Sequence, residues 1–187
     1  MSSDRKIYKA HNNLLLIAMF SIIMLFAGLT SAYIVSKGSL GLKWDYISMP
    51  TMFYLSTIMI IFSSMCGYKS VLYAKNDNFK MVNKFLTCTI LFGLAFLLFQ
   101  ILGWKSLVSS GKFLSGNNVA SSYFYLLTFA HLAHLFGGLV SLLYTFNKSF
   151  KKRYSSVDHQ GLKLSIRFWH FLAFLWIYLF VFLIIIN

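Results

Sequence analysis

Five long apolar runs alternate with short polar connections along this chain of 187 residues. The runs are roughly Leu14–Ser36, Thr51–Tyr73, Phe85–Ser106, Ser121–Phe146 and Leu164–Ile186. Each has about 20 residues, the length that an α-helix needs to cross a bilayer core. No run shows the alternating pattern of a membrane β-strand. The pattern therefore predicts an all-α, polytopic membrane protein in which residues 1–187 form a single five-helix bundle.

The connections between the runs are too short to fold alone. The longest has about 17 residues, and the composition is 58% hydrophobic and 19% aromatic. Segments of this length cannot bury a core of their own. We therefore expect any chemistry to lie in the bundle or in partner proteins. The first run continues through Val35, beyond the length of a signal-peptide core, so we expect it to be retained as a span.

Basic residues are distributed unevenly on the two sides of the predicted spans. The N-terminal tail and the second and fourth connections, with their flanks, carry 13 of the 17 Lys and Arg residues, and the other side carries four. Positive residues favour the cytoplasmic side, so the N-terminus is predicted to be cytoplasmic and the C-terminus periplasmic. The basic loops then face anionic lipid headgroups, and nucleic acid is not expected as a partner.

Acidic residues are absent from the apolar runs: Asp4, Asp45, Asp77 and Asp158 all lie outside them. Proteins that move protons or cations through their own helices usually keep a carboxylate within the bilayer. A transporter is therefore disfavoured. Both cysteines lie within runs without metal-ligand spacing, so we expect packing roles, and no catalytic or metal-binding residue is predicted.

Polar side chains within the runs allow two interpretations. His131 and His134 lie in the fourth run, His170 in the fifth and Gln100 in the third. They could form hydrogen bonds between helices. Alternatively, His131 or His134 could bind haem b together with His170, as in the membrane anchor of a respiratory complex. An absorbance spectrum would separate the two.

Two further patterns concern packing and lipid. Gly28-x-x-x-Ala32 and Ser63-x-x-x-Gly67 place small residues on one helix face, where a neighbouring backbone can approach closely. Arg167 and Trp169, two residues further on, lie near the inner end of the fifth run. Both are candidates for contact with lipid headgroups.

Several of these residues resemble motifs of one family, subunit III of haem–copper oxidases (cytochrome c and quinol oxidases). The fourth run is similar to its T-G-x-H-x-x-H-V-x-x-G stretch, and the fifth to its Y-W-H-F-x-x-x-x-W stretch. The third run is similar to its G-x-x-F-x-x-x-Q-x-E-W/Y stretch. The matching residues are Thr128, His131, His134, Gly138, Trp169, His170, Phe171, Trp176, Gly93, Phe96, Gln100 and Trp104. The resemblance covers nearly the whole chain and is to the short, five-span bacterial form.

The resemblance implies a non-catalytic subunit of an aerobic terminal oxidase in the bacterial plasma (inner) membrane. It implies subunits I and II as partners, with haem and copper held there and none in this chain. It also implies structural phospholipids between helices, structural histidines, bracing of the catalytic subunit and an oxidase that could join a larger respiratory supercomplex. The electron donor, cytochrome c or quinol, is set in other subunits.

This chain departs from the family at acidic positions. Ile22 follows Ser21 where the family often has Glu, Gly103 precedes Trp104, and Ala173 stands where Asp commonly follows the W-H-F segment. A direct role in proton supply is therefore not expected.

Overall fold

The computed structural model describes residues 2–41, 44, 46–112, 119–150 and 160–186, and these ranges contain five long α-helices. They are α1 (Ser2–Leu40), α2 (Thr51–Lys75), α3 (Phe79–Ser109), α4 (Val119–Phe150) and α5 (Gln160–Ile186). All five are long and apolar enough to cross a membrane, so the chain is an integral membrane protein. The predicted all-helical, five-span architecture is confirmed.

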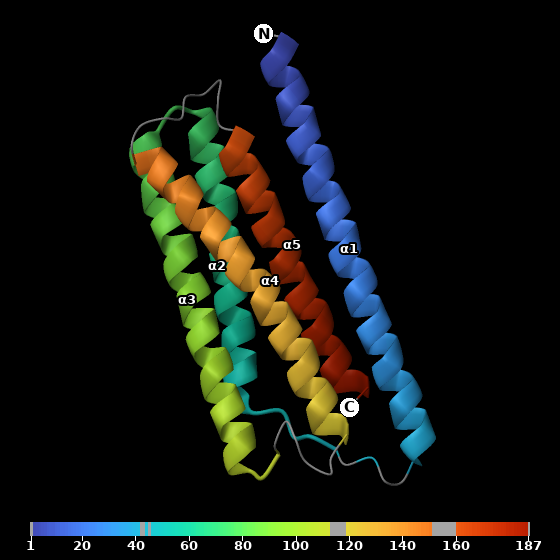
Figure 1. The fold of residues 1–187 in the computed structure, drawn as a ribbon. Coiled ribbons are helices and arrows are strands. Elements are labelled where there is room, and N and C mark those ends of the chain that lie inside the picture. The colour runs from blue at the N-terminus through green and yellow to red at the C-terminus, as the bar shows by residue number, and fades with distance from the viewer. Residues whose placement is uncertain (1, 42–43, 45, 113–118, 151–159, 187) are drawn as a thin grey trace.

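The helices run further than the apolar runs predicted. α1 begins 12 residues before Leu14, and α3 begins at Phe79 instead of Phe85. Hydropathy marks the part of a helix inside the hydrocarbon, whereas backbone hydrogen bonding continues into the interface. The polar N-terminal tail is thus a continuation of the first span, and it extends beyond the ends of the other helices (Figure 1).

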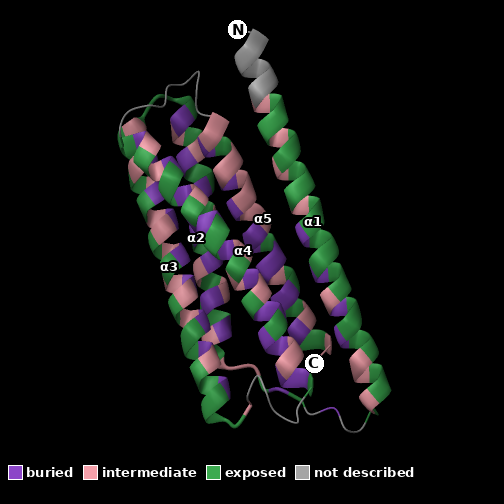
Figure 2. Ribbon diagram, in the orientation of Figure 1, coloured by how far each residue is buried: buried purple, intermediate pink, exposed green. Residues whose placement is uncertain are grey.

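Four helices form the body of the bundle, and α1 lies at its side (Figure 1). α2 packs against α3 and α5, and α4 packs against α3 and α5, so these four helices form a closed ring of neighbours. α1 packs only against α4 and α5 within the described part of the chain. Consistent with this place, α1 is mostly exposed, whereas the inward faces of the other helices are buried (Figure 2).

The connection between α2 and α3 is a tight turn, and its shape depends on two neighbouring residues, Asp77 and Asn78. Asp77 adopts a positive φ of 52°, a conformation that aspartate tolerates better than most residues. Asn78 follows as the N-cap of α3, and its side chain accepts a hydrogen bond of 3.3 Å from the backbone N–H of Met81. The two helices therefore reverse direction within three residues and pack antiparallel.

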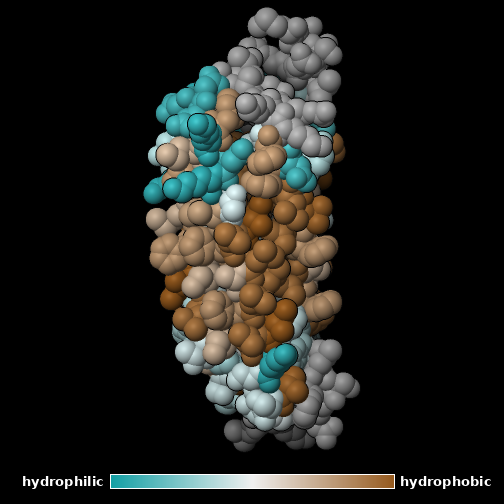
Figure 3. Space-filling view, turned by 90° about the vertical axis from the view of Figure 1, so that its left-hand side faces the viewer, coloured by the Kyte–Doolittle hydropathy of each residue, from teal (hydrophilic) through white to brown (hydrophobic). Residues whose placement is uncertain are grey.

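The outer surface has the polarity expected in a bilayer. On the face drawn in Figure 3, hydrophobic side chains cover the middle of the molecule, and hydrophilic side chains gather toward the end that holds the N-terminus. Exposed basic residues from the turn between α2 and α3 contribute there, among them Lys75, Lys80 and Lys84. Lys43, Lys151, Lys152 and Arg153, and the side chains of Arg5 and Lys6, lie outside the described residues.

Candidate functional site

Trp169 of α5 joins three other helices at the centre of the bundle. Its side chain is fully buried, and Nε1 donates a 3.0 Å hydrogen bond to Oγ of Ser63 on α2. The same ring lies against two glycines: a β-carbon on Gly93 of α3 would be 2.8 Å from Cζ2, and one on Gly138 of α4 would be 3.3 Å from Cε3. The absence of a side chain at Gly93 therefore makes room for the Trp169 ring, and Gly138 lets α4 approach the same ring closely.

Trp176, two turns further along α5, has a similar position. Its Nε1 donates a 3.0 Å hydrogen bond to Oγ1 of Thr57 on α2. Its ring centroid lies 5.2 Å from that of Phe96 on α3 and 5.3 Å from that of His131 on α4. The two tryptophans thus fix α5 against the same three helices at two depths.

The hydroxyl groups that accept these bonds also donate hydrogen bonds to backbone carbonyls. Ser63 donates across to the carbonyl of Thr89 on α3 at 2.7 Å, and Thr57 donates to the carbonyl of Phe53 in its own helix at 2.8 Å. No water is available in a bilayer core to satisfy an N–H or O–H group. Each of these groups therefore has a protein partner, and the arrangement stabilises one mutual rotation of the helices.

The predicted polar residues have different partners. Nε2 of Gln100 donates a 3.0 Å hydrogen bond to Oγ of Ser56, which connects α3 with α2. His170 of α5 is hydrogen-bonded through Nδ1 to Oγ of Ser64 on α2 at 2.5 Å. His134 bonds within α4, because its Nδ1 donates to the carbonyl of Ala130 at 2.7 Å.

His131 differs from the polar residues described above. It is fully buried, and neither ring nitrogen has a hydrogen-bond partner within the described residues. Its neighbours are aromatic rings: Phe26, Phe96 and Trp176 lie at centroid distances of 6.4, 6.3 and 5.3 Å. His131 therefore contributes to the core as a ring packed edge-to-face against Phe26 and Phe96 and tilted against Trp176.

The two residues expected at lipid headgroups occupy unlike positions. Trp169 has no exposed surface, so the part of the bundle that it occupies is out of reach of a headgroup. Arg167 is half-buried, and its guanidinium donates a 2.6 Å hydrogen bond to Oδ1 of Asn12 on α1. This bond holds the first helix to the last near the N-terminal end of the bundle. Residues two apart on an α-helix point to different sides, so Trp169 faces the core while Arg167 faces α1.

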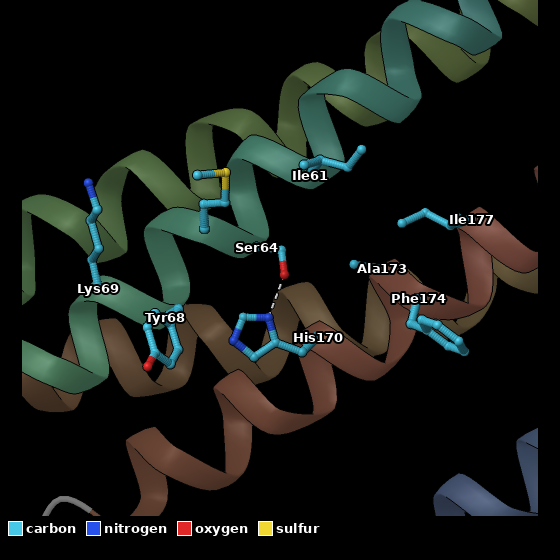
Figure 4. A pocket seen from close by; sticks show the side chains of 9 residues that line it. Ile61, Ser64, Tyr68, Lys69, His170, Ala173, Phe174 and Ile177 are labelled. Carbon is cyan, nitrogen blue, oxygen red and sulfur yellow. Dashed lines mark hydrogen bonds between the residues drawn. The ribbon is translucent and has the colours of Figure 1, made fainter.

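Three hollows lie along α5, and all three are lined by Phe174, whose side chain is 72% exposed. The largest, of about 560 Å³, lies between α2 and α5 and is called the α2–α5 groove below (Figure 4). Another of the three hollows, of about 340 Å³, lies between α1 and α5. The α2–α5 groove is lined by Ile61, Ser64, Met65, Tyr68, Lys69, His170, Ala173, Phe174 and Ile177.

A metal centre is not formed by the described residues. No group of three or more His, Cys, Asp or Glu side chains comes together in the part of the chain that the structure covers. Cys66 and Cys88 are free thiols within the spans. Apart from His131, the polar side chains described above form hydrogen bonds within this chain, and several of these bonds hold neighbouring helices together.

Comparison with known proteins gives a consistent result. The family described as Cytochrome c oxidase subunit III matches residues 5–186. Cytochrome bo(3) ubiquinol oxidase subunit 3 of Buchnera aphidicola subsp. Acyrthosiphon pisum is 34% identical over 89% of this chain and 82% of its own length. Cytochrome c oxidase subunit 3 of Thermostichus vulcanus is 28% identical over 92% and 86%. Probable cytochrome c oxidase subunit 3 of Mycobacterium leprae is 26% identical over 84% and 79%.

Proposed function

Because this chain belongs to the cytochrome c oxidase subunit III family and is thus subunit III of a haem–copper terminal oxidase in respiration, we propose that it braces the catalytic subunit without taking part in the chemistry. The observation that carries this proposal is the use of the polar groups inside the bundle. Trp169, Trp176 and Gln100 each bind a hydroxyl of α2, so they serve the packing of this chain. Oxygen reduction then takes place in the partner subunits, which we propose hold the haem and copper.

We propose that the three histidines are structural, since the family assignment favours an oxidase subunit over a haem-b-binding anchor. His170 and His134 each use Nδ1 in a hydrogen bond to this chain. His131 is enclosed by aromatic rings. These contacts support a structural role for all three residues.

Removal of this subunit is expected to leave the initial rate of oxygen reduction largely unchanged but to shorten the active life of the oxidase or weaken its assembly. The reason is that a bracing bundle stabilises its neighbour without touching the reacting atoms. The measurement is oxygen uptake over many turnovers by the purified oxidase with and without this chain, at matched haem content. Complete loss of the initial rate in a fully haem-loaded remainder would contradict the proposal.

We further propose that the chain lies in a bacterial plasma membrane with its N-terminus in the cytoplasm. The support is the basic surface at the N-terminal end of the bundle and the bacterial sources of the relatives. Alkaline phosphatase fused after Asn187 is expected to be active, since it would be exported, and the same enzyme fused after Lys75 inactive. The reverse pattern of activity would show the opposite orientation.

Structural phospholipids are a second part of the proposal. The hollows along α5 are almost wholly apolar and open toward the surroundings of the bundle, which suits acyl chains where no protein covers them. Arg167 remains a candidate for headgroup contact, because its guanidinium has further donors besides the one bonded to Asn12. Lipid analysis of the purified oxidase, before and after Arg167→Leu, tests this: unchanged bound lipid would rule out the headgroup contact.

A further inference from the structure

Cys66 of α2 and Cys88 of α3 occupy matching positions on two antiparallel neighbours. Phe62, one turn before Cys66, and Phe92, one turn after Cys88, contact each other with their ring centroids 6.0 Å apart. Residues four apart lie on the same face of a helix, so this contact places the two cysteines on the faces that α2 and α3 turn toward each other. Both cysteines are free thiols, and both are partly exposed.

The next turn of the two helices repeats this register. Lys69, one turn after Cys66, extends toward α3 (Figure 4), and its Nζ lies 5.7 Å from the ring centroid of Phe85, one turn before Cys88. The two cysteines therefore lie between one contact of α2 with α3 on either side. Consistent with this placement, Cys88 and Lys69 are the groups that act electrostatically on the Cys66 thiol.

The two helices approach each other closely beside this pair. Oγ of Ser63 donates to the backbone carbonyl of Thr89, the neighbour of Cys88, at 2.7 Å. A β-carbon on Gly67, the neighbour of Cys66, would lie 3.7 Å from Cγ2 of Thr89. A disulfide needs β-carbons about 4 Å apart. Because a serine and a glycine let the backbones approach here, side chains at paired positions beside the contact can reach this separation.

We propose that Cys66 and Cys88 form a redox-modification site at which hydrogen peroxide closes a disulfide between α2 and α3. The Cys66 thiolate attacks one peroxide oxygen, the O–O bond breaks, and the hydroxide that leaves takes up the thiol proton to form water. The Cys88 thiolate then attacks the sulfur of the sulfenic acid, an S–S bond forms, and the second hydroxide leaves as water with the proton of Cys88. In total, two thiols and one peroxide give one disulfide and two waters, and the sulfur pair loses the two electrons that peroxide gains.

Lys69 determines which of the two thiols reacts first. Apolar surroundings oppose the ionisation of a thiol, whereas positive charge beside it favours the thiolate, which is the nucleophile. Lys69 lies one turn from Cys66 on the same helix and acts on its thiol. Cys66 is therefore the attacking cysteine, and Cys88 resolves the sulfenic acid. The pair lies within this chain, so the inference does not depend on the proposed function.

The test treats native membranes that contain the intact oxidase with hydrogen peroxide, blocks the remaining thiols with N-ethylmaleimide and identifies linked peptides by mass spectrometry without reduction. We expect a pair of peptides joined through Cys66 and Cys88, which dithiothreitol separates into free thiols. Thiols that stay free in excess peroxide, or that are oxidised singly without forming a disulfide, would overturn the proposal. A disulfide to another polypeptide in place of the expected one would also overturn it.

A cysteine pair out of register is the matched control. Cys88→Ser combined with Thr87→Cys keeps two thiols at nearly the same depth but moves one of them to an exposed position on a different side of α3. We expect this variant to lose the intramolecular disulfide, because the β-carbons are then too far apart. Equal yields from the two pairs would show that the register does not bring the thiols together, and would contradict the site.

Single-cysteine variants test the order of the two steps. In Cys88→Ser the attacking thiol has no partner, so dimedone, which traps sulfenic acids, should label Cys66 after peroxide treatment. In Cys66→Ser the label on Cys88 should be about threefold lower, the effect of one partly exposed charge. Lys69→Gln, combined with Cys88→Ser, should lower the labelling of Cys66 to a similar extent. Equal labelling of both cysteines, with no effect of Lys69→Gln, would contradict the assigned order.

Discussion

Replacement of Trp169 by alanine is expected to lower the free energy of unfolding of the bundle by about 3 to 5 kcal/mol, the usual cost of removing a buried tryptophan. The side chain is fully buried and touches α2, α3 and α4 at once, so its loss leaves a cavity that no single neighbour can fill. The glycines opposite it cannot fill the space, because they carry no side chain. The measurement is the midpoint of thermal unfolding of the purified subunit in detergent.

Two controls separate the loss of the ring from other effects of substitution. Phe129→Ala removes an aromatic ring that is 64% exposed on α4, and it should change the midpoint little. Trp169→Phe keeps most of the ring but removes the donor to Ser63, whose own bond to Thr89 remains. We expect it to fall between the parent and Trp169→Ala. A Trp169→Ala protein as stable as Phe129→Ala would show that α5 is not held in the way described.

Alanine in place of glycine is expected to have opposite effects at two positions. At Gly103 the new β-carbon would lie 2.7 Å from Cε2 of Phe53, a fully buried ring that packs against Phe124 and Trp176. Such overpacking typically costs about 1 to 3 kcal/mol. At Gly137 a β-carbon would meet nothing within 4 Å, so alanine should stabilise the helix by up to about 1 kcal/mol.

The same unfolding measurement checks this pair of variants. Gly103→Ala should unfold at a lower temperature than the parent and Gly137→Ala at the same or a higher one. Since the two changes are chemically identical, any effect of the substitution itself cancels between them. A lower midpoint for Gly137→Ala than for Gly103→Ala would contradict the close packing of Phe53 against Gly103.

The number, type and approximate position of the helices could be predicted from the sequence, because a bilayer imposes one length and one polarity on every span. The start of α2 at Thr51 was predicted to the residue, helped by Pro50, which ends the preceding connection. The start of α1 was predicted 12 residues late, because its first turns are polar and hydropathy does not detect them.

How the helices are rotated about their axes could not be predicted. Small residues at a spacing of four suggested close contacts on the first and second spans alike. The structure buries Ser63 and Gly67 of α2 in such a contact, whereas Gly28 and Ala32 of α1 are exposed. A small-residue pattern shows that approach is sterically possible, but a neighbour must be present on that side. On α1, the described part of the chain provides none.

The hydrogen bonds from the tryptophan N–H groups to hydroxyl groups of α2 were also not predicted. Ser63 was considered only for its small size, and the pairing of Ser63 and Thr57 with Trp169 and Trp176 depends on which helices are neighbours. Sequence gives no direct signal for that. The one available hint is that buried tryptophans need an acceptor, and Ser and Thr are the polar residues most often present in spans.

The position of α1 has a consequence for how the protein is made. Its neighbours are α4 and α5, and three hydrogen bonds tie it to the last helix: Arg167 to Asn12, Tyr178 with Thr30, and Lys37 to the carbonyl of Ile186. α1 is the first helix to be synthesised, so these three hydrogen bonds can form only after the last helix has been made. A nascent chain that stops before α5 would leave α1 with contacts to α4 but without any of the three bonds.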